Sequence, residues 1–202
     1  GGGTGAIREV LPRSNKFSRM ARRGRTREQI IAANVDQVAG VFALHRPELR
    51  FDLLDRMTIE AEILQVPLLI ILTKIDLAEP GEIDELRELY GGLGYRILTT
   101  SAVTGHGIDA VREALRGHFT PLIGESGVGK TTLLNLMQPG LLRRTGEVRD
   151  DRRGRGRHTT TMVEAVPLDV SGWVVDTPGI NDLGLYLPPD LAGRDPASFF
   201  PE

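Results

Sequence analysis

A stretch near the middle of the chain has the composition of a phosphate-binding loop. Residues 124–131 read GESGVGKT and match the pattern G-x-x-x-x-G-K-[ST]. In such a loop the glycines let backbone N–H groups point into a concavity that holds phosphate oxygens. We expect Lys130 to reach the outer phosphates, the Thr131 hydroxyl to bind Mg²⁺, and the following helix to present its positive end. An apolar run before the loop and a helical pattern after it favour this interpretation over a chance glycine-rich turn. The expected phosphate-binding residues are Gly124, Glu125, Ser126, Gly127, Val128, Gly129, Lys130, Thr131 and Thr132.

A second candidate lies downstream, where residues 176–179 read DTPG. The carboxylate of Asp176 can hold Mg²⁺ through water, and the N–H of Gly179 can sense a γ-phosphate. The D-x-x-G pattern is weak alone, but here it follows an apolar run, 172–176, downstream of a phosphate loop.

Residues 73–76 read TKID, also end an apolar run, and resemble the N-K-x-D base-reading motif. Asp76 can accept two hydrogen bonds from the N1–H and the exocyclic amine of guanine, a donor pair that adenine lacks. The stem of Lys74 can lie along the base, and Thr73 replaces the usual Asn, which predicts one weaker anchoring contact. The expected base-binding residues of this motif are Thr73, Lys74, Ile75 and Asp76.

The dipeptide Ser101–Ala102 resembles the S-A-K loop, in which the alanine N–H meets the guanine O6, although Val103 replaces the lysine. Alone, the TKID stretch could equally be an ordinary strand-to-loop turn with a capping aspartate. A second base-binding dipeptide at the end of a later strand favours GTP over ATP.

The residue that would position water for hydrolysis is unusual. Many GTPases place a glutamine directly after D-x-x-G, whereas this chain has Ile180. His158, in an Arg-rich stretch beside three threonines, is the candidate to orient water; the alternative is that it contacts RNA or solvent. One of these threonines should close on Mg²⁺, and Thr160 is favoured. The expected catalytic residues are Lys130, Thr160 and His158, and the expected metal ligands are Thr131, Thr160 and Asp176.

Short apolar runs alternate with amphipathic helical patterns along the chain. This alternation predicts an α/β fold of the P-loop NTPase type, a mainly parallel sheet with helices on both faces. Predicted strands span 38–44, 67–72, 95–100, 119–124 and 172–176, with an extra edge strand within 160–169. Predicted helices span 51–64, 82–90, 107–117 and 130–137.

The motifs occur in the order base loop, S-A loop, phosphate loop, DTPG, whereas the usual order begins with the phosphate loop. The observed order is a cyclic rotation, which is tolerated when the original termini lie close together on the surface. The new covalent join would run from the helix over 107–117 into the strand over 119–124. The sequence therefore predicts a circularly permuted GTPase.

Composition limits the other possibilities. The 202 residues are 40% hydrophobic and 26% charged, and contain no cysteine. These values are typical of a globular domain and exclude a disulfide or a thiolate metal site within these residues. The longest apolar run, 66–72, is too short to span a membrane and no signal pattern opens the chain, so a cytoplasmic setting is expected.

The net charge of −2 conceals an asymmetry. Residues 1–31 carry a net charge of +6 and residues 143–158 a net charge of +4, which leaves about −12 on the remainder. Basic patches on an acidic body indicate an anionic partner, of which RNA is the most obvious, although solvated loops would have the same composition.

The rotated motif order, together with GRGRHTTT over 154–161, resembles the bacterial ribosome-small-subunit-dependent GTPase A family (RsgA or YjeQ). The stretches IAANVDQV (31–38) and TGE (145–147) are similar to that family too. The resemblance implies a GTPase that binds GTP/GDP and Mg²⁺ and acts in late maturation of the small (30S) ribosomal subunit, with its rRNA as partner and hydrolysis stimulated by the subunit. It points to the same histidine, His158. No membrane or DNA partner is expected, and the protein is expected to be a monomer.

The resemblance also implies a domain organisation. Residues 1–30 would be a basic lead-in similar to the end of an OB-fold, 31–187 the permuted GTPase domain, and 188–202 the lead-in to a C-terminal zinc module. Zinc is expected for the family, but no cysteine ligand for it lies in this sequence. The alternatives are a GTPase of large-subunit assembly, a GTP-gated RNA-binding switch with little turnover, and an ATPase.

Overall fold

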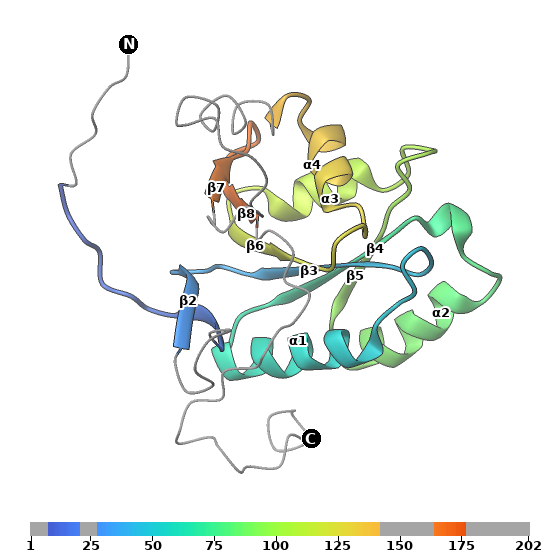
Figure 1. Ribbon diagram of the computed structural model, residues 1–202, viewed down its shortest axis with the longest axis horizontal. Coiled ribbons are helices and arrows are strands. Elements are labelled where there is room, and N and C mark those ends of the chain that lie inside the picture. The colour runs from blue at the N-terminus through green and yellow to red at the C-terminus, as the bar shows by residue number, and fades with distance from the viewer. Residues whose placement is uncertain (1–7, 21–27, 142–163, 177–202) are drawn as a thin grey trace, which may run out of the picture.

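The computed structural model describes residues 8–20, 28–141 and 164–176. Its centre is a six-stranded sheet in the order β5-β4-β3-β6-β8-β7 (Figure 1). All neighbouring strands run parallel except β7, which pairs antiparallel with β8 at the edge. The predicted parallel sheet with one added edge strand is confirmed. The strands are β3 (Val38–Ala43), β4 (Leu68–Thr73), β5 (Arg96–Thr99), β6 (Phe119–Ile123), β7 (Glu164–Pro167) and β8 (Trp173–Asp176).

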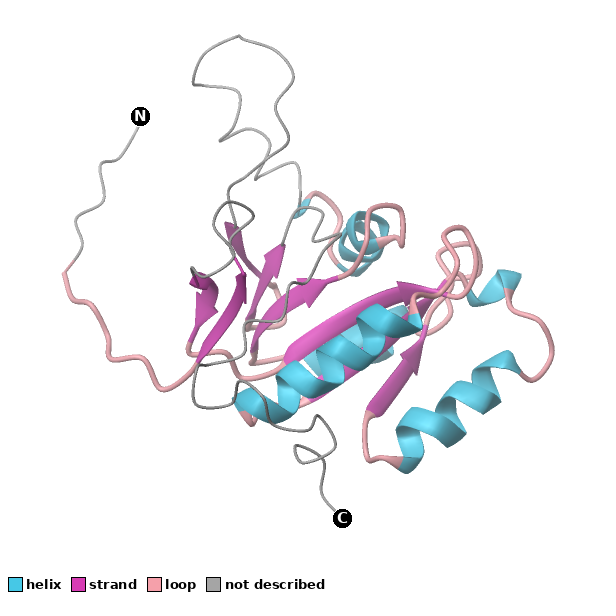
Figure 2. Ribbon diagram, turned by 60° about the horizontal axis from the view of Figure 1, so that its bottom comes forward, coloured by secondary structure: helices cyan, strands magenta, loops and turns pink. Residues whose placement is uncertain are grey.

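Helices cover both faces of this sheet, as Figures 1 and 2 show. Strands β3 and β4 are buried at every position, as expected where a parallel sheet is covered on both sides. Alternate residues therefore enter two separate cores: Ile70 belongs to the core beneath α1 and Ile71 to the core beneath α3 and α4. The helices are α1 (Phe51–Leu64), α2 (Glu82–Leu86), α3 (Ile108–Leu115) and α4 (Lys130–Met137).

Two local features differ from the expectation. The single helix predicted over 82–90 is α2 followed by a π-helical turn, Arg87–Gly91. An antiparallel pair that the sequence did not predict, β1 (Lys16–Met20) with β2 (Glu28–Ala33), precedes the main sheet. The proposed boundary between residues 30 and 31 falls inside β2, and Phe17 of β1 is buried in the core beneath α1.

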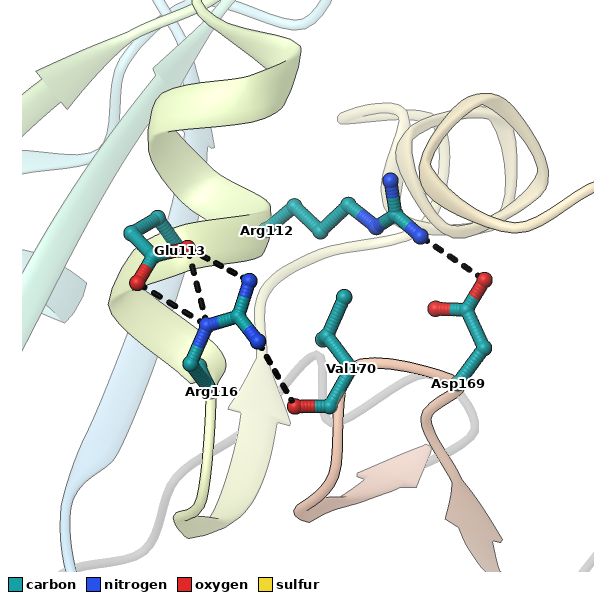
Figure 3. A network of polar contacts seen from close by, with 5 residues as sticks. All are labelled: Arg112, Glu113, Arg116, Asp169 and Val170. Carbon is teal, nitrogen blue, oxygen red and sulfur yellow. Dashed lines mark hydrogen bonds and ion pairs between the residues drawn. The ribbon is translucent and has the colours of Figure 1, made fainter.

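The join between α3 and β6 lies beside the turn between β7 and β8 (Figure 3). Arg112 Nη2 donates to Asp169 Oδ2 at 2.7 Å, and Arg116 Nη1 donates to the carbonyl of Val170 at 3.5 Å. The predicted covalent join therefore enters β6 at the amino end of the strands. Among the described residues, no helix is long and apolar enough to cross a membrane.

Candidate nucleotide-binding site

The described parts of the predicted motifs lie at one edge of the sheet, with Asp176 as the only described residue of DTPG. Because β4, β5, β6 and β8 are parallel, the segments that follow them all leave from their carboxyl ends, which is where open α/β sheets bind ligands. A hollow of about 70 Å³ there is shared by both sets of motifs. Its lining comprises Thr73, Lys74, Thr100, Ala102, Ile108, Val128, Gly129, Thr132, Leu133 and Leu136.

The two base-reading motifs are joined by a hydrogen bond between their side chains. Ser101 Oγ donates to Asp76 Oδ1 at 2.5 Å. Ser101 Oγ itself accepts the backbone N–H groups of Val103 and Thr104 at 3.2 and 3.3 Å. Ser101 is buried and Asp76 is exposed, so the serine holds an accessible carboxylate in a fixed orientation. Ile75, which lies between Lys74 and Asp76, begins a short 3₁₀ turn, Ile75–Leu77.

Thr73 connects the base-reading side to the phosphate loop. Its buried Oγ1 lies 3.1 Å from the carbonyl oxygen of Phe42 and 2.5 Å from that of Val128. The hydroxyl can donate to these acceptors in turn. Threonine at this position therefore supplies an anchoring contact of its own, where the sequence predicted a weakened one.

Lys74 extends the same connection on the protein surface. Its backbone is left-handed, with φ of 56°, and its Nζ donates to the carbonyl of Gly127 at 2.7 Å and to that of Arg46. The lysine therefore ties the base loop to the phosphate loop and to the segment between β3 and α1. Sequence reasoning gave this lysine only a role along the base.

The phosphate loop packs directly against β3. A Cβ added at Gly124 would lie 2.2 Å from the carbonyl oxygen of Val41, so glycine is required there by close backbone approach. Lys130 opens α4 and is 8% exposed; its Nζ donates to the carbonyls of Gly124 and Glu125 at 2.5 and 2.8 Å. A phosphate oxygen would share this ammonium group with the loop's own carbonyls.

An ion pair that sequence reasoning missed borders the phosphate loop. Arg50, just before α1, donates from Nη1 to Glu125 Oε1 at 3.0 Å and also pairs with Asp52. The hydrogen bond from Arg50 lowers the pKa of the Asp52 carboxyl, and the two carboxylates raise the pKa of the arginine. Arg50 and Glu125 are far apart in sequence, so no local pattern could have indicated the pair.

Two of the three expected magnesium ligands, Thr131 and Asp176, belong to described elements. Thr131 is in the first turn of α4, and Asp176 is the last residue of β8, paired in register with Leu122 just before the phosphate loop. Hydroxyl and carboxylate oxygens are the donors that Mg²⁺ prefers. Within the described ranges, no group of three or more His, Asp or Glu residues could hold a metal by itself. The remaining predicted residues, His158, Thr160 and Gly179, lie outside the described residues.

Comparisons with known proteins agree with this geometry. The family model described as RsgA GTPase matches residues 10–186. A Small ribosomal subunit biogenesis GTPase RsgA from Moorella thermoacetica is 42% identical over 202 residues, which cover 100% of this chain and 64% of that protein. One from Caldanaerobacter subterraneus subsp. tengcongensis is 40% identical over 184 residues, covering 91% of this chain and 59% of that protein. The chain thus spans about three fifths of the length of these relatives.

Two solved structures share the fold. YjeQ from Thermotoga maritima has a TM-score of 0.63 at 34% identity, with 86% of this chain and 55% of that chain covered. YloQ, described as a circularly permuted GTPase, has a TM-score of 0.58 at 28% identity, with 87% and 52% covered. The predicted permuted α/β fold is confirmed by these matches, and the chain belongs to the RsgA GTPase family.

Proposed function

We propose that the chain binds GTP with Mg²⁺ and hydrolyses it to GDP and phosphate. The observation that carries this proposal is the Asp76 carboxylate, held by Ser101 at the same sheet edge as the phosphate loop and linked to that loop through Thr73. A fixed carboxylate acceptor selects guanine, because it pairs with two adjacent donors that adenine cannot offer.

The chain's own residues would share the work as follows. The backbone N–H groups over 124–131 and the ammonium group of Lys130 bind the phosphates, while Thr131 and Asp176 hold Mg²⁺. When bound, the metal neutralises charge that develops on the phosphate oxygens. Thr160 would help to hold the metal and His158 would orient the attacking water, since Ile180 offers no hydrogen-bonding side chain for that task.

We place this activity in assembly of the small ribosomal subunit, where the subunit and its rRNA stimulate hydrolysis. The matching relatives are named Small ribosomal subunit biogenesis GTPases, and the net charges of +6 and +4 on residues 1–31 and 143–158 suit an RNA partner. The second segment contains His158, so an RNA contact there would bear directly on the chemistry.

The experiment is steady-state phosphate release from GTP, with and without purified small subunits. We expect slow release alone and a marked increase with small subunits, abolished in Lys130→Ala. His158→Ala should bind GTP normally but lose the stimulation. Stronger stimulation by large than by small subunits would support a large-subunit factor instead. Nucleotide-dependent binding to subunits without stimulated release would support a GTP-gated RNA-binding switch, and competition by ATP equal to that by GTP would exclude base selection.

A further inference from the structure

A hollow separate from the nucleotide site lies between the start of α1 and α2, the two helices on the same face in Figure 1. Its volume is about 300 Å³, at the lower end of the range for ligand pockets. Leu44 and Leu86 are buried beneath it, whereas Phe51 and Leu89 at its rim are 51% and 55% exposed. Large apolar side chains that surround a hollow on an exposed face mark an interaction site.

The polar part of this hollow is acidic. Glu48, Glu82 and Glu85 line it, and no lysine or arginine of the described chain does. Its single basic group, His45, already contacts Glu82 Oε2 at 2.9 Å and Glu48 Oε2 at 3.2 Å. The hydrogen bond with Glu82 raises the pKa of His45 and so favours its cationic form. Three carboxylates against this one imidazole still leave the lining net negative. Such a surface repels phosphate groups and therefore does not suit RNA.

We propose that this hollow docks a basic protein segment, with an apolar anchor residue over Leu44 and Leu86 and flanking Lys or Arg side chains against Glu48, Glu82 and Glu85. An apolar centre surrounded by a polar, solvent-accessible rim is the usual anatomy of a protein–protein interface. The partner differs in class from the RNA proposed for the chain's basic segments.

The hollow also connects to the nucleotide site. The segment between β3 and α1 lines it and, through the carbonyl of Arg46 and the guanidinium group of Arg50, contacts Lys74 and Glu125. A bound segment would therefore contact the part of the chain that touches both the base loop and the phosphate loop. Docking and nucleotide binding share that segment.

The first experiment tests the chemistry without a ribosome, by calorimetric titration of the chain with a synthetic peptide of leucines and lysines. Controls replace its leucines with serine or its lysines with glutamate. We expect saturable binding of the first peptide only, weakened about tenfold by Leu89→Ser or by Glu85→Lys. Trp173→Ser, at an exposed position on β8, is the matched control and should bind normally. Equal binding by wild type and Leu89→Ser would overturn the proposal.

The second experiment identifies the natural occupant and rests on the proposed function. A photo-crosslinking amino acid at position 89, with position 173 as control, is activated in the presence of purified small subunits. We expect crosslinks from position 89 to a basic segment of a ribosomal protein, lost with Glu85→Lys. Crosslinks to rRNA or to a second copy, or none although the chain pellets with the subunit, would contradict the docking. Failure to pellet would count against the proposed ribosomal function, and the peptide titration would still decide the docking.

Discussion

The two ends of the parallel strands are built from different kinds of contact. At the carboxyl ends, side chains bind one another and the carbonyls of neighbouring loops: Ser101 holds Asp76, and Lys130 bonds to the phosphate loop. At the amino ends, where α3 joins β6, backbone groups meet directly, as the N–H of Trp173 does with the carbonyl of His118 at 2.8 Å, and the ion pair of Arg112 with Asp169 lies on the exposed surface. Nucleotide recognition and covalent closure are thus separated by the length of a strand.

This separation explains how a rotated chain can keep its nucleotide-binding motifs together. The join changes the covalent path only at the amino ends, and the segments at the carboxyl ends keep the same neighbours. Substitutions at the carboxyl ends should therefore change nucleotide affinity and leave stability unaltered, whereas substitutions at the join should do the reverse. Variants at the two ends test this contrast.

The largest effect is expected for Asp76→Asn. The amide that replaces the carboxylate loses charge-assisted hydrogen bonds worth about 1.5–3 kcal/mol each, so GTP affinity should fall about 100-fold or more. Xanthine nucleotides, which offer an acceptor to the new amide donor, should gain affinity. Competition against a fluorescent GTP analogue measures both changes.

The control for Asp76→Asn is Ser101→Ala, which leaves the carboxylate but removes its 2.5 Å partner and should weaken GTP binding by a smaller factor. The urea midpoint of Asp76→Asn should match that of the wild type. Unchanged GTP affinity in Asp76→Asn would place base selection elsewhere.

At the join, Gly172→Ala should cost about 2–4 kcal/mol of unfolding free energy. Gly172 has φ of 95°, and an added Cβ would lie 2.8 Å from the carbonyl oxygens of both Leu115 and His118. Gly117→Ala is the matched control, because Gly117 also has positive φ, 73°, but open space around its Cβ. Urea unfolding should show a distinctly larger loss for Gly172→Ala, with GTP affinity of the folded protein unchanged. Equal losses would mean that backbone strain alone, not the close contact, accounts for the effect.

The sequence predicted what depends on local pattern. The continuous apolar runs at 38–44 and 67–72 predicted buried parallel strands, because only strands covered on both faces are apolar at every position. The motifs at 73–76 and 124–131 predicted where the chemistry lies, because glycine spacing and strand ends constrain a phosphate loop and its neighbours. Their rotated order was sufficient to predict the permutation.

The sequence did not predict contacts between residues distant along the chain. Arg50 meets Glu125, and Thr73 meets the carbonyl of Val128, across gaps that carry no periodicity. The pair β1–β2 was missed because its residues lie in a basic stretch with little apolar alternation. Such features depend on how the elements pack, so only three-dimensional placement reveals them.

A smaller effect on affinity is expected at the ion pair beside the phosphate loop. In Arg50→Ala the Glu125 carboxylate loses its partner and opposes the nucleotide's phosphates, so GTP affinity should fall about three- to tenfold. The Arg50 side chain is 42% exposed, so solvent limits the effect although Glu125 is only 18% exposed. The double variant Arg50→Ala/Glu125→Gln should recover most of the affinity. Binding of guanosine, which carries no phosphate, should be unaltered in all three proteins; a parallel loss would indicate a distorted site instead.

The smallest effect is expected for the ion pair at the join. Arg112→Met keeps the aliphatic stem and removes the 2.7 Å contact with Asp169. The side chains of Arg112 and Asp169 are 36% and 47% exposed. Exposed pairs contribute about 0–1 kcal/mol, and this variant also removes Nε, a buried donor without a partner among the described residues. The two effects oppose each other, so the unfolding free energy should change by no more than about 0.5 kcal/mol. Urea unfolding at low and high salt measures it, and salt should shrink the remaining difference because it screens only the pair. A loss as large as that of Gly172→Ala would mean that charge, not backbone packing, holds the join closed.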